Sequence, residues 1–86
     1  MQAKLVFLGR LEDMAGRAGE DISILAPLDW YDVIGWLGDH YPPNLADAVA
    51  GSKVKVAING ALIADKHTLV LADGDELAFL PPVSGG

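Results

Sequence analysis

The sequence contains no cysteine among its 86 residues. This absence excludes disulfide bonds, thiolate nucleophiles, iron–sulfur clusters and zinc sites built from cysteine. Histidine is scarce as well: His40 and His67 lie far apart in the sequence, and neither has carboxylate neighbours at metal-ligand spacing. We therefore expect no metal site in this protein.

Positive charge is also scarce, because six Lys and Arg residues stand against twelve Asp and Glu residues. The formal net charge of −6 argues against a nucleic-acid partner, since a phosphate backbone attracts Lys and Arg and repels carboxylates. A chain of this charge would instead be steered toward a basic protein surface.

Long hydrophobic runs are missing too. No stretch approaches the roughly 18 continuous apolar residues of a membrane helix, and the opening MQAKLVFLGR does not resemble a signal peptide. We expect a cytoplasmic protein with no membrane contact. Its length suits one domain, and a hydrophobic share of 51% allows one core.

The first third of the chain predicts two strands. KLVFLG is rich in strand formers and stops at Gly9, and DISIL alternates between apolar and polar residues. Gly16 and Gly19 lie between these segments, so we expect a hairpin with a long, mobile loop.

The middle of the chain predicts the main helix. Asp29 is placed as its N-cap, Asp32 lies in its first turn, and Pro42 and Pro43 end it. Its apolar residues follow helical spacing and form one stripe: Trp30, Val33, Ile34, Leu37 and Tyr41. A short second helix is expected to follow, with Asn44 as its cap and Gly51 as its stop.

The last third predicts more strands. KVKVAI alternates, and the Asn59-Gly60 pair that follows it is a strong signal for a hairpin with a type I′ turn. TLVL is compatible with either a brief strand or an irregular segment. ELAFL is the last strand, with Phe79 and Leu80 on opposite faces.

This order predicts an α+β domain in which a mixed sheet of four to five strands packs on one main helix. The order and size suit the ubiquitin-like β-grasp fold, whose first and last strands run parallel in the centre of the sheet. We assign residues 1–80 to this domain and residues 81–86 to a flexible C-terminal tail.

The tail reads PPVSGG, and each residue type in it favours insertion into a narrow channel. Pro81 and Pro82 favour an extended backbone, and Gly85 and Gly86 have no Cβ to clash with channel walls. Val83 and Ser84 complete the arm, with Ser84 as a small spacer. The reactive group at its tip is the α-carboxylate of Gly86, which becomes a good acylating group once ATP has adenylated it. Because the chain lacks cysteine, any sulfur that it carries must be attached at this terminus.

Residues 58–86, INGALIADKHTLVLADGDELAFLPPVSGG, closely resemble the C-terminal third of the small subunit of molybdopterin synthase, the MoaD family of sulfur carriers. DGDELAF and the ending PPVSGG are the specific parts, and LVFLGRLEDMAG, residues 5–16, resembles the family's first strand and loop more loosely.

The resemblance implies a cycle of reactions on Gly86. A partner similar to ubiquitin-activating enzymes would adenylate its carboxylate with ATP, and a sulfurtransferase would convert it to a thiocarboxylate. The tail would then enter the large subunit of molybdopterin synthase and give its sulfur to precursor Z, within a heterotetramer that contains two copies of each subunit. The catalytic residues would lie on the large subunit, and no cofactor would be bound by this chain.

By position, the resemblance also assigns Leu62 and Leu80 to partner docking, with Phe79 as a further candidate. Each of the three could instead fill the core or the sheet edge, and for Phe79 the core is favoured. Three other functions stay open: a carrier for thiamin or cysteine synthesis, a protein modifier that joins Gly86 to a lysine, and a plain binding domain.

Overall fold

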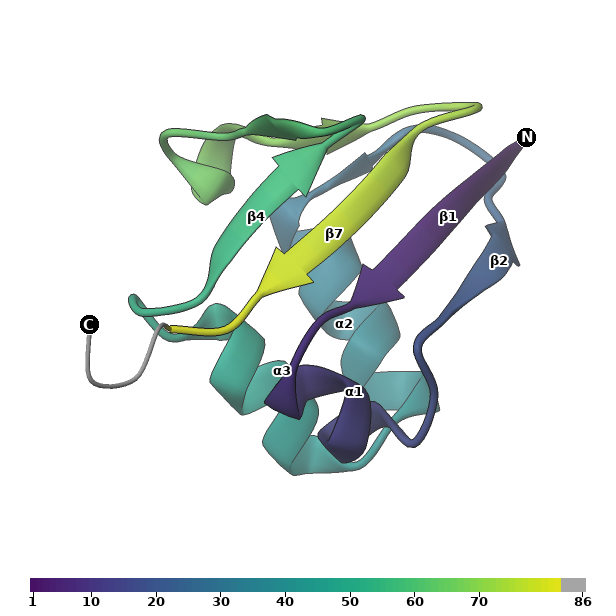
Figure 1. Ribbon diagram of the computed structural model, residues 1–86. Helices are drawn as coiled ribbons and strands as arrows, with labels where there is room; N and C mark the ends of the chain where they lie inside the picture. The colour runs from purple at the N-terminus through teal and green to yellow at the C-terminus, as the bar shows by residue number, and fades with distance from the viewer. Residues whose placement is uncertain (83–86) are drawn as a thin grey trace.

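The structure is a computed structural model, and it describes residues 1–82 of the chain. A mixed sheet forms one layer, and helices cover one of its faces (Figure 1). The strands are β1 (Gln2–Phe7), β2 (Gly19–Ser23), β3 (Leu28–Asp29), β4 (Lys55–Ile58), β5 (Ala61–Leu62), β6 (Val70–Leu71) and β7 (Glu76–Leu80). The helices are α1 (Arg10–Ala15), α2 (Trp30–His40) and α3 (Pro43–Ala50), with a short 3-10 helix, η1, at Lys66–Thr68.

The main sheet has five strands in the order β2-β1-β7-β4-β5. Strands β1 and β7 are parallel neighbours in its centre, and every other pair in it is antiparallel. This is the arrangement that the sequence predicts. A second sheet joins β3 to β6, which settles TLVL as a brief strand and adds a partner strand that the sequence analysis did not predict.

Helix α2 begins as predicted. The Asp32 N–H donates to the Asp29 carboxylate over 2.8 Å, and the Asp29 N–H donates back to the Asp32 carboxylate over 3.2 Å, which completes a capping box. Of its predicted stripe, Trp30, Val33 and Leu37 are buried, and the other two residues pack at the edge of the core.

Two details of the helices differ from the prediction. The segment between β1 and β2 contains α1 rather than only a loop, because Gly9 and Gly16 both adopt positive φ and bound one short helical segment. Helix α3 begins at Pro43 rather than after Asn44, since proline is well suited to the first turn of a helix, where its missing N–H is not needed.

Lys66 fixes the connection from α3 to β4. Its ammonium donates to the carbonyls of Val49 and Val54, each over 2.9 Å, and to the carbonyl of Gly51. It also lies 5.3 Å from the centre of the Trp30 ring. Burial lowers the pKa of this ammonium, and the nearby charge of Lys55 lowers it further. The loop at residues 51–54 is therefore held on both sides by one side chain.

Hydrogen bonds also join the Asn59-Gly60 turn to the turn that precedes β7. Asn59 and Gly60 have φ values of 52° and 84°, as the predicted hairpin turn requires. The Asp75 carboxylate accepts from the Asn59 side-chain amide and from the Ala72 N–H, each over 2.9 Å. These bonds hold the pKa of Asp75 below its usual range, with the backbone bond as the larger cause.

We predict that Asp75→Asn lowers the melting temperature at pH 7. The difference in melting temperature between this variant and wild type should become smaller as the pH is lowered. A depressed folded-state pKa contributes stability above the unfolded value of about 3.9, and this contribution is lost as the pH falls through the folded value. Thermal melting of both proteins across this range measures the effect, with Asp39→Asn on α2 as the control. A difference that does not depend on pH would contradict the assignment.

Candidate functional site

The candidate site begins where β7 ends. Leu80 is the last residue of that central strand, and Pro81 and Pro82, which we call the tail root, follow it directly. The chain is anchored there by the Leu8 N–H, which donates to the Phe79 carbonyl over 3.2 Å. The remaining tail residues, including Gly86 with its predicted reactive carboxylate, lie outside the described residues: Val83, Ser84, Gly85 and Gly86.

Gly9, which lies between β1 and α1, contacts the tail root. Its backbone has φ 55° and ψ −132°, a combination that favours glycine strongly. A Cβ at this position would lie 2.9 Å from Cγ of Pro81, closer than carbon atoms normally approach. The absence of a side chain at Gly9 therefore lets Pro81 lie against the end of β1.

The alternation along β7 separates two of the predicted docking residues. Phe79 is 0% exposed, and its ring stacks on Phe7 with 5.4 Å between ring centres. It therefore belongs to the core, as the sequence favoured, and the folded domain does not offer it to a partner. Leu80 points to the other face and is half-buried.

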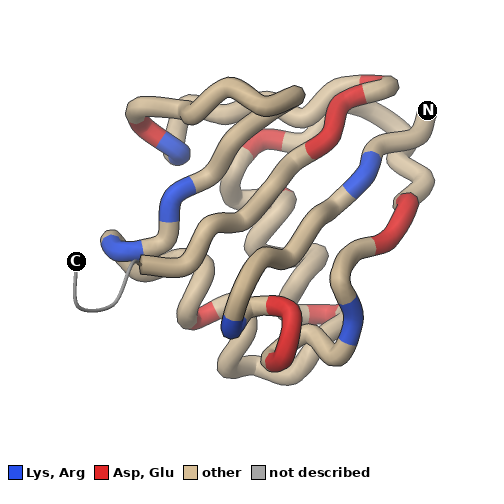
Figure 2. Tube along the Cα trace, in the orientation of Figure 1, with Lys and Arg blue, Asp and Glu red and all other residues tan. Residues whose placement is uncertain are grey.

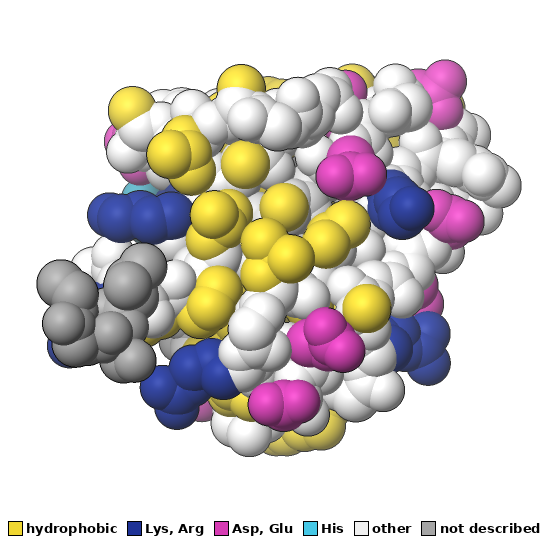
Figure 3. Space-filling model, in the orientation of Figure 1, with side chains coloured by type: hydrophobic (Ala, Val, Ile, Leu, Met, Phe, Trp, Pro, Cys, Tyr) yellow, Lys and Arg dark blue, Asp and Glu magenta, His cyan; other side chains and the backbone are white. Residues whose placement is uncertain are grey.

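Leu80 belongs to an apolar patch on the face of the sheet that α2 does not cover. Strand register aligns the other members in one row across four strands, because Leu62 pairs with Ala57, Ala57 with Ala78, and Ala78 with Val6. Figure 3 shows apolar side chains gathered in the middle of this face, with charged side chains around them. We call these five residues the outer sheet face.

Leu62 is the most accessible member of the outer sheet face, with 68% of its surface exposed. It lies on β5, at the edge of the sheet, so its side chain contributes little to the core. The structure thus brings Leu62 and Leu80 onto one surface, as docking residues would require. Their role in docking remains a prediction.

The charges around the tail root are mainly positive, in contrast to the chain as a whole. Lys55 pairs across the sheet with Leu80, and Arg10 follows Gly9 at the start of α1. Figure 2 shows acidic residues on α1, where Glu12 and Asp13 follow Arg10, and at the start of β7, where Glu76 lies opposite Lys4.

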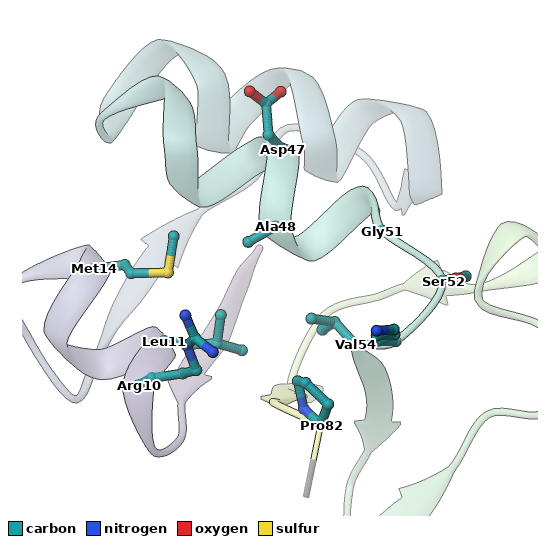
Figure 4. A pocket seen from close by; sticks show the side chains of 10 residues that line it. Arg10, Leu11, Met14, Asp47, Ala48, Gly51, Ser52, Val54 and Pro82 are labelled. Atoms are coloured by element: carbon teal, nitrogen blue, oxygen red, sulfur yellow. The ribbon is translucent and has the colours of Figure 1, made fainter. Parts of the chain in front are cut away.

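A cavity of about 410 Å³ opens beside the tail root, between α1, α3 and the loop that precedes β4 (Figure 4). Apolar and positively charged side chains together make most of its wall. The described residues that line it are Arg10, Leu11, Met14, Asp47, Ala48, Gly51, Ser52, Lys53, Val54 and Pro82. In Figure 4 the Asp47 carboxylate points away from Pro82, at the far side of the cavity.

Two features are absent from residues 1–82. No group of three or more His, Asp and Glu side chains there is placed to hold a metal ion. None of the helices in this part of the chain has the length and hydrophobicity to cross a membrane.

The fold and the site together define a class of protein. Parallel β1 and β7 occupy the centre of a mixed sheet, α2 covers one face, and the C-terminal segment leaves from the central strand. This is a ubiquitin-like β-grasp domain.

The chain belongs to the ThiS family, whose sequence model matches residues 5–86. It is similar to the molybdopterin synthase sulfur carrier subunit of Anopheles gambiae. The two sequences are 30% identical over 89 aligned positions, which cover 100% of this chain and 93% of that relative.

Solved structures are similar over the same length. Small archaeal modifier protein 1 of Methanosarcina acetivorans is 26% identical with a TM-score of 0.75, and the alignment covers 99% of this chain and 96% of that one. A chain from the complex of subunits 1 and 2 of the molybdopterin-converting factor of Helicobacter pylori is 26% identical with a TM-score of 0.65, and both chains are covered fully.

Sequence reasoning did not identify Gly9 or the cavity as parts of the site. The only signal in the sequence is the position of Gly9 directly after the first strand, and that position also suits an ordinary strand end. Its contact with Pro81 follows from the parallel register of β1 and β7, which joins residues that are far apart along the chain.

We predict that Gly9→Ala lowers the free energy of unfolding by about 1–3 kcal/mol, because it forces alanine into a strained backbone conformation and against Pro81. Denaturant unfolding measures this loss. Gly38→Ala is the control: Gly38 lies inside α2 with open space around it, so alanine there should stabilise the protein by about 0.5–1 kcal/mol. Equal stability of Gly9→Ala and wild type would disprove the role given to Gly9.

Proposed function

We propose that this protein is the sulfur carrier of molybdenum cofactor biosynthesis, the small subunit of a molybdopterin synthase. The observation that supports this most strongly is family membership that extends through Gly86, together with full-length similarity to a molybdopterin synthase sulfur carrier subunit. The resemblance of residues 58–86 to that family, which the sequence alone provides, agrees with it.

The proposed chemistry takes place at the Gly86 carboxylate. A carboxylate oxygen attacks the α-phosphorus of ATP, pyrophosphate leaves, and an acyl-adenylate forms on the adenylyltransferase. A sulfide equivalent from a sulfurtransferase then attacks the acyl carbon, AMP leaves, and the tail ends in a thiocarboxylate. After sulfur has passed to precursor Z, water restores the carboxylate. A dithiolene contains two sulfur atoms, so each product requires two rounds.

In this proposal, residues 1–80 form the docking body and residues 81–86 form the arm that enters partner active sites. The large synthase subunit would bind the outer sheet face through Leu62 and Leu80 and would supply the catalytic groups. The Helicobacter pylori structure, a complex of subunits 1 and 2 of the molybdopterin-converting factor, supports such a pairing by similarity. The ATP-dependent step would place the protein in the cytoplasm.

A second candidate is a protein modifier, which is favoured by the similarity to small archaeal modifier protein 1. The same adenylated Gly86 would then be joined to the amine of a lysine on another protein. A sulfur carrier for thiamin or cysteine synthesis would also share the thiocarboxylate. The acceptor, rather than the activation of Gly86, distinguishes these functions.

We expect intact protein purified from a host with the activating enzymes to carry the mass increment of an oxygen-to-sulfur exchange at its C-terminus. Incubation with precursor Z and the large subunit should then remove that increment and yield molybdopterin. A carboxylate that stays unmodified under these conditions would argue against a sulfur carrier. Conjugates of this chain on lysines of other proteins, without molybdopterin formation, would favour the modifier.

Deletion of Gly86 should abolish both the mass increment and sulfur transfer, because the new terminus is one residue short of the active site. The melting temperature should change by less than about 4 °C, since the proposal gives Gly86 no part in the core and changes outside packed features usually alter stability by less than about 0.5 kcal/mol. Circular dichroism melting is the control. A comparable loss of stability would indicate a structural role for the tail instead.

We predict that Leu62→Ser weakens binding of the large subunit by roughly tenfold while the fold stays stable. Leu62 is 68% exposed, so its removal costs the core little but takes an apolar contact from the outer sheet face. Titration calorimetry with the large subunit measures the change. Val70→Ser is the matched control, because Val70 is also exposed but lies on β6 in the other sheet.

A further inference from the structure

The cavity beside the tail root combines an apolar wall with a positively charged rim. Met14 is half-buried, Val54 is buried, and Pro82 completes the apolar wall on the side of the tail. Arg10 and Lys53 line the same cavity and are exposed. A cavity of about 410 Å³ is large enough to take one or two side chains of a partner.

The charge of this region runs against the charge of the protein. Arg10 and Lys53 line the cavity, and Lys55 pairs with Leu80 directly before the tail root, so three of the six Lys and Arg residues of the chain lie near the tail root. The chain as a whole has a net charge of −6. An acidic partner surface would be repelled by most of this molecule and attracted here.

The backbone segments that carry Arg10 and Lys53 are fixed relative to the tail root. Arg10 follows Gly9, which Pro81 contacts, and it is the first residue of α1. Lys53 lies between Gly51 and Val54, whose carbonyls both accept from the Lys66 ammonium. A partner that binds both cations would therefore meet the tail root in one orientation.

Covalent geometry places any enzyme that acts on Gly86 against this region. Four residues follow Pro82, and a fully extended chain spans at most about 3.3–3.6 Å per residue, or roughly 14 Å. The mouth of the channel that receives the tail must therefore lie close to the tail root, where it meets the cavity and its cations.

We propose that the cavity is a docking site for the activating adenylyltransferase, whose channel mouth would present an apolar side chain flanked by carboxylates. The apolar side chain enters between Met14 and Val54, and the carboxylates pair with Arg10 and Lys53. This inference rests on the proposed adenylation of Gly86, and it adds the chemical character of the partner surface. Charge complementarity of this kind orients encounter and excludes wrong partners.

The test is the rate of ATP–pyrophosphate exchange catalysed by the adenylyltransferase, measured at varied carrier and ATP concentrations. Arg10→Glu and Lys53→Glu should each raise the KM for the carrier roughly tenfold, since each replaces an attraction by a repulsion, and leave the KM for ATP unchanged. Both effects should shrink in high salt. Arg17→Glu is the matched control, because it changes the net charge equally but at the α1–β2 connection, where Arg17 pairs with Glu20 over 3.1 Å.

Two further variants test the sign of the charge effect and the apolar contact. Asp47→Lys removes the one carboxylate among the described lining residues, so it should lower the KM for the carrier. Met14→Gln keeps the length of the side chain but makes it polar, so it should raise that KM. Thermal melting of each variant, expected to be close to wild type, shows that the fold is retained.

Several results would overturn the proposal. These are an Arg10→Glu variant that behaves like wild type, an Arg17→Glu variant that is equally impaired, and an increase in the KM for ATP, which would assign the cations to nucleotide phosphate instead. If the wild-type protein supports no exchange at all, the proposed function fails together with this inference. If wild type is active and the Arg10 and Lys53 variants are equally active, only the docking site fails.

Discussion

The parallel pairing of β1 with β7 is the contact on which the rest of this structure depends. It joins the two ends of the domain, and closing so long a stretch of chain carries an entropic cost. Stacking of Phe7 on Phe79 across this pair buries two aromatic rings completely, and burial of each is worth about 1.5–3 kcal/mol. The same pairing brings Gly9 to Pro81 and so fixes the position of the tail root.

The two faces of the sheet carry different kinds of side chain. The inner face carries the large side chains that pack on α2, among them Phe79 and Leu77. The outer face carries a row of smaller side chains with the accessible Leu62 at its edge. Neighbouring residues of a strand point to opposite faces. Phe79 therefore lies in the core and Leu80 on the outer sheet face, although they are adjacent in the sequence. A substitution on one face can therefore alter binding with little effect on the core.

The charge at the tail root differs in sign from the net charge that the composition gives. An acidic chain is expected to seek a basic partner, and most of the surface of this protein fits that expectation. Around the tail root the balance reverses, because Arg10 and Lys53 line the cavity there. These cations come from segments that are more than forty residues apart, so the total charge of the chain could not reveal their proximity.

The sequence by itself determined the features that depend on local patterns. Helix α2, its Asp29 cap, the Asn59-Gly60 turn and the alternation of Phe79 and Leu80 all follow from residue spacing and turn chemistry, and the order of the predicted elements indicated the β-grasp fold. The tertiary structure decided what depends on contacts between distant segments. It brought Pro81 onto Gly9, assembled the outer sheet face from four strands, and enclosed the cavity between α1 and α3. No local pattern encodes these contacts, because each depends on how segments that are distant in the sequence pair and pack in the folded domain.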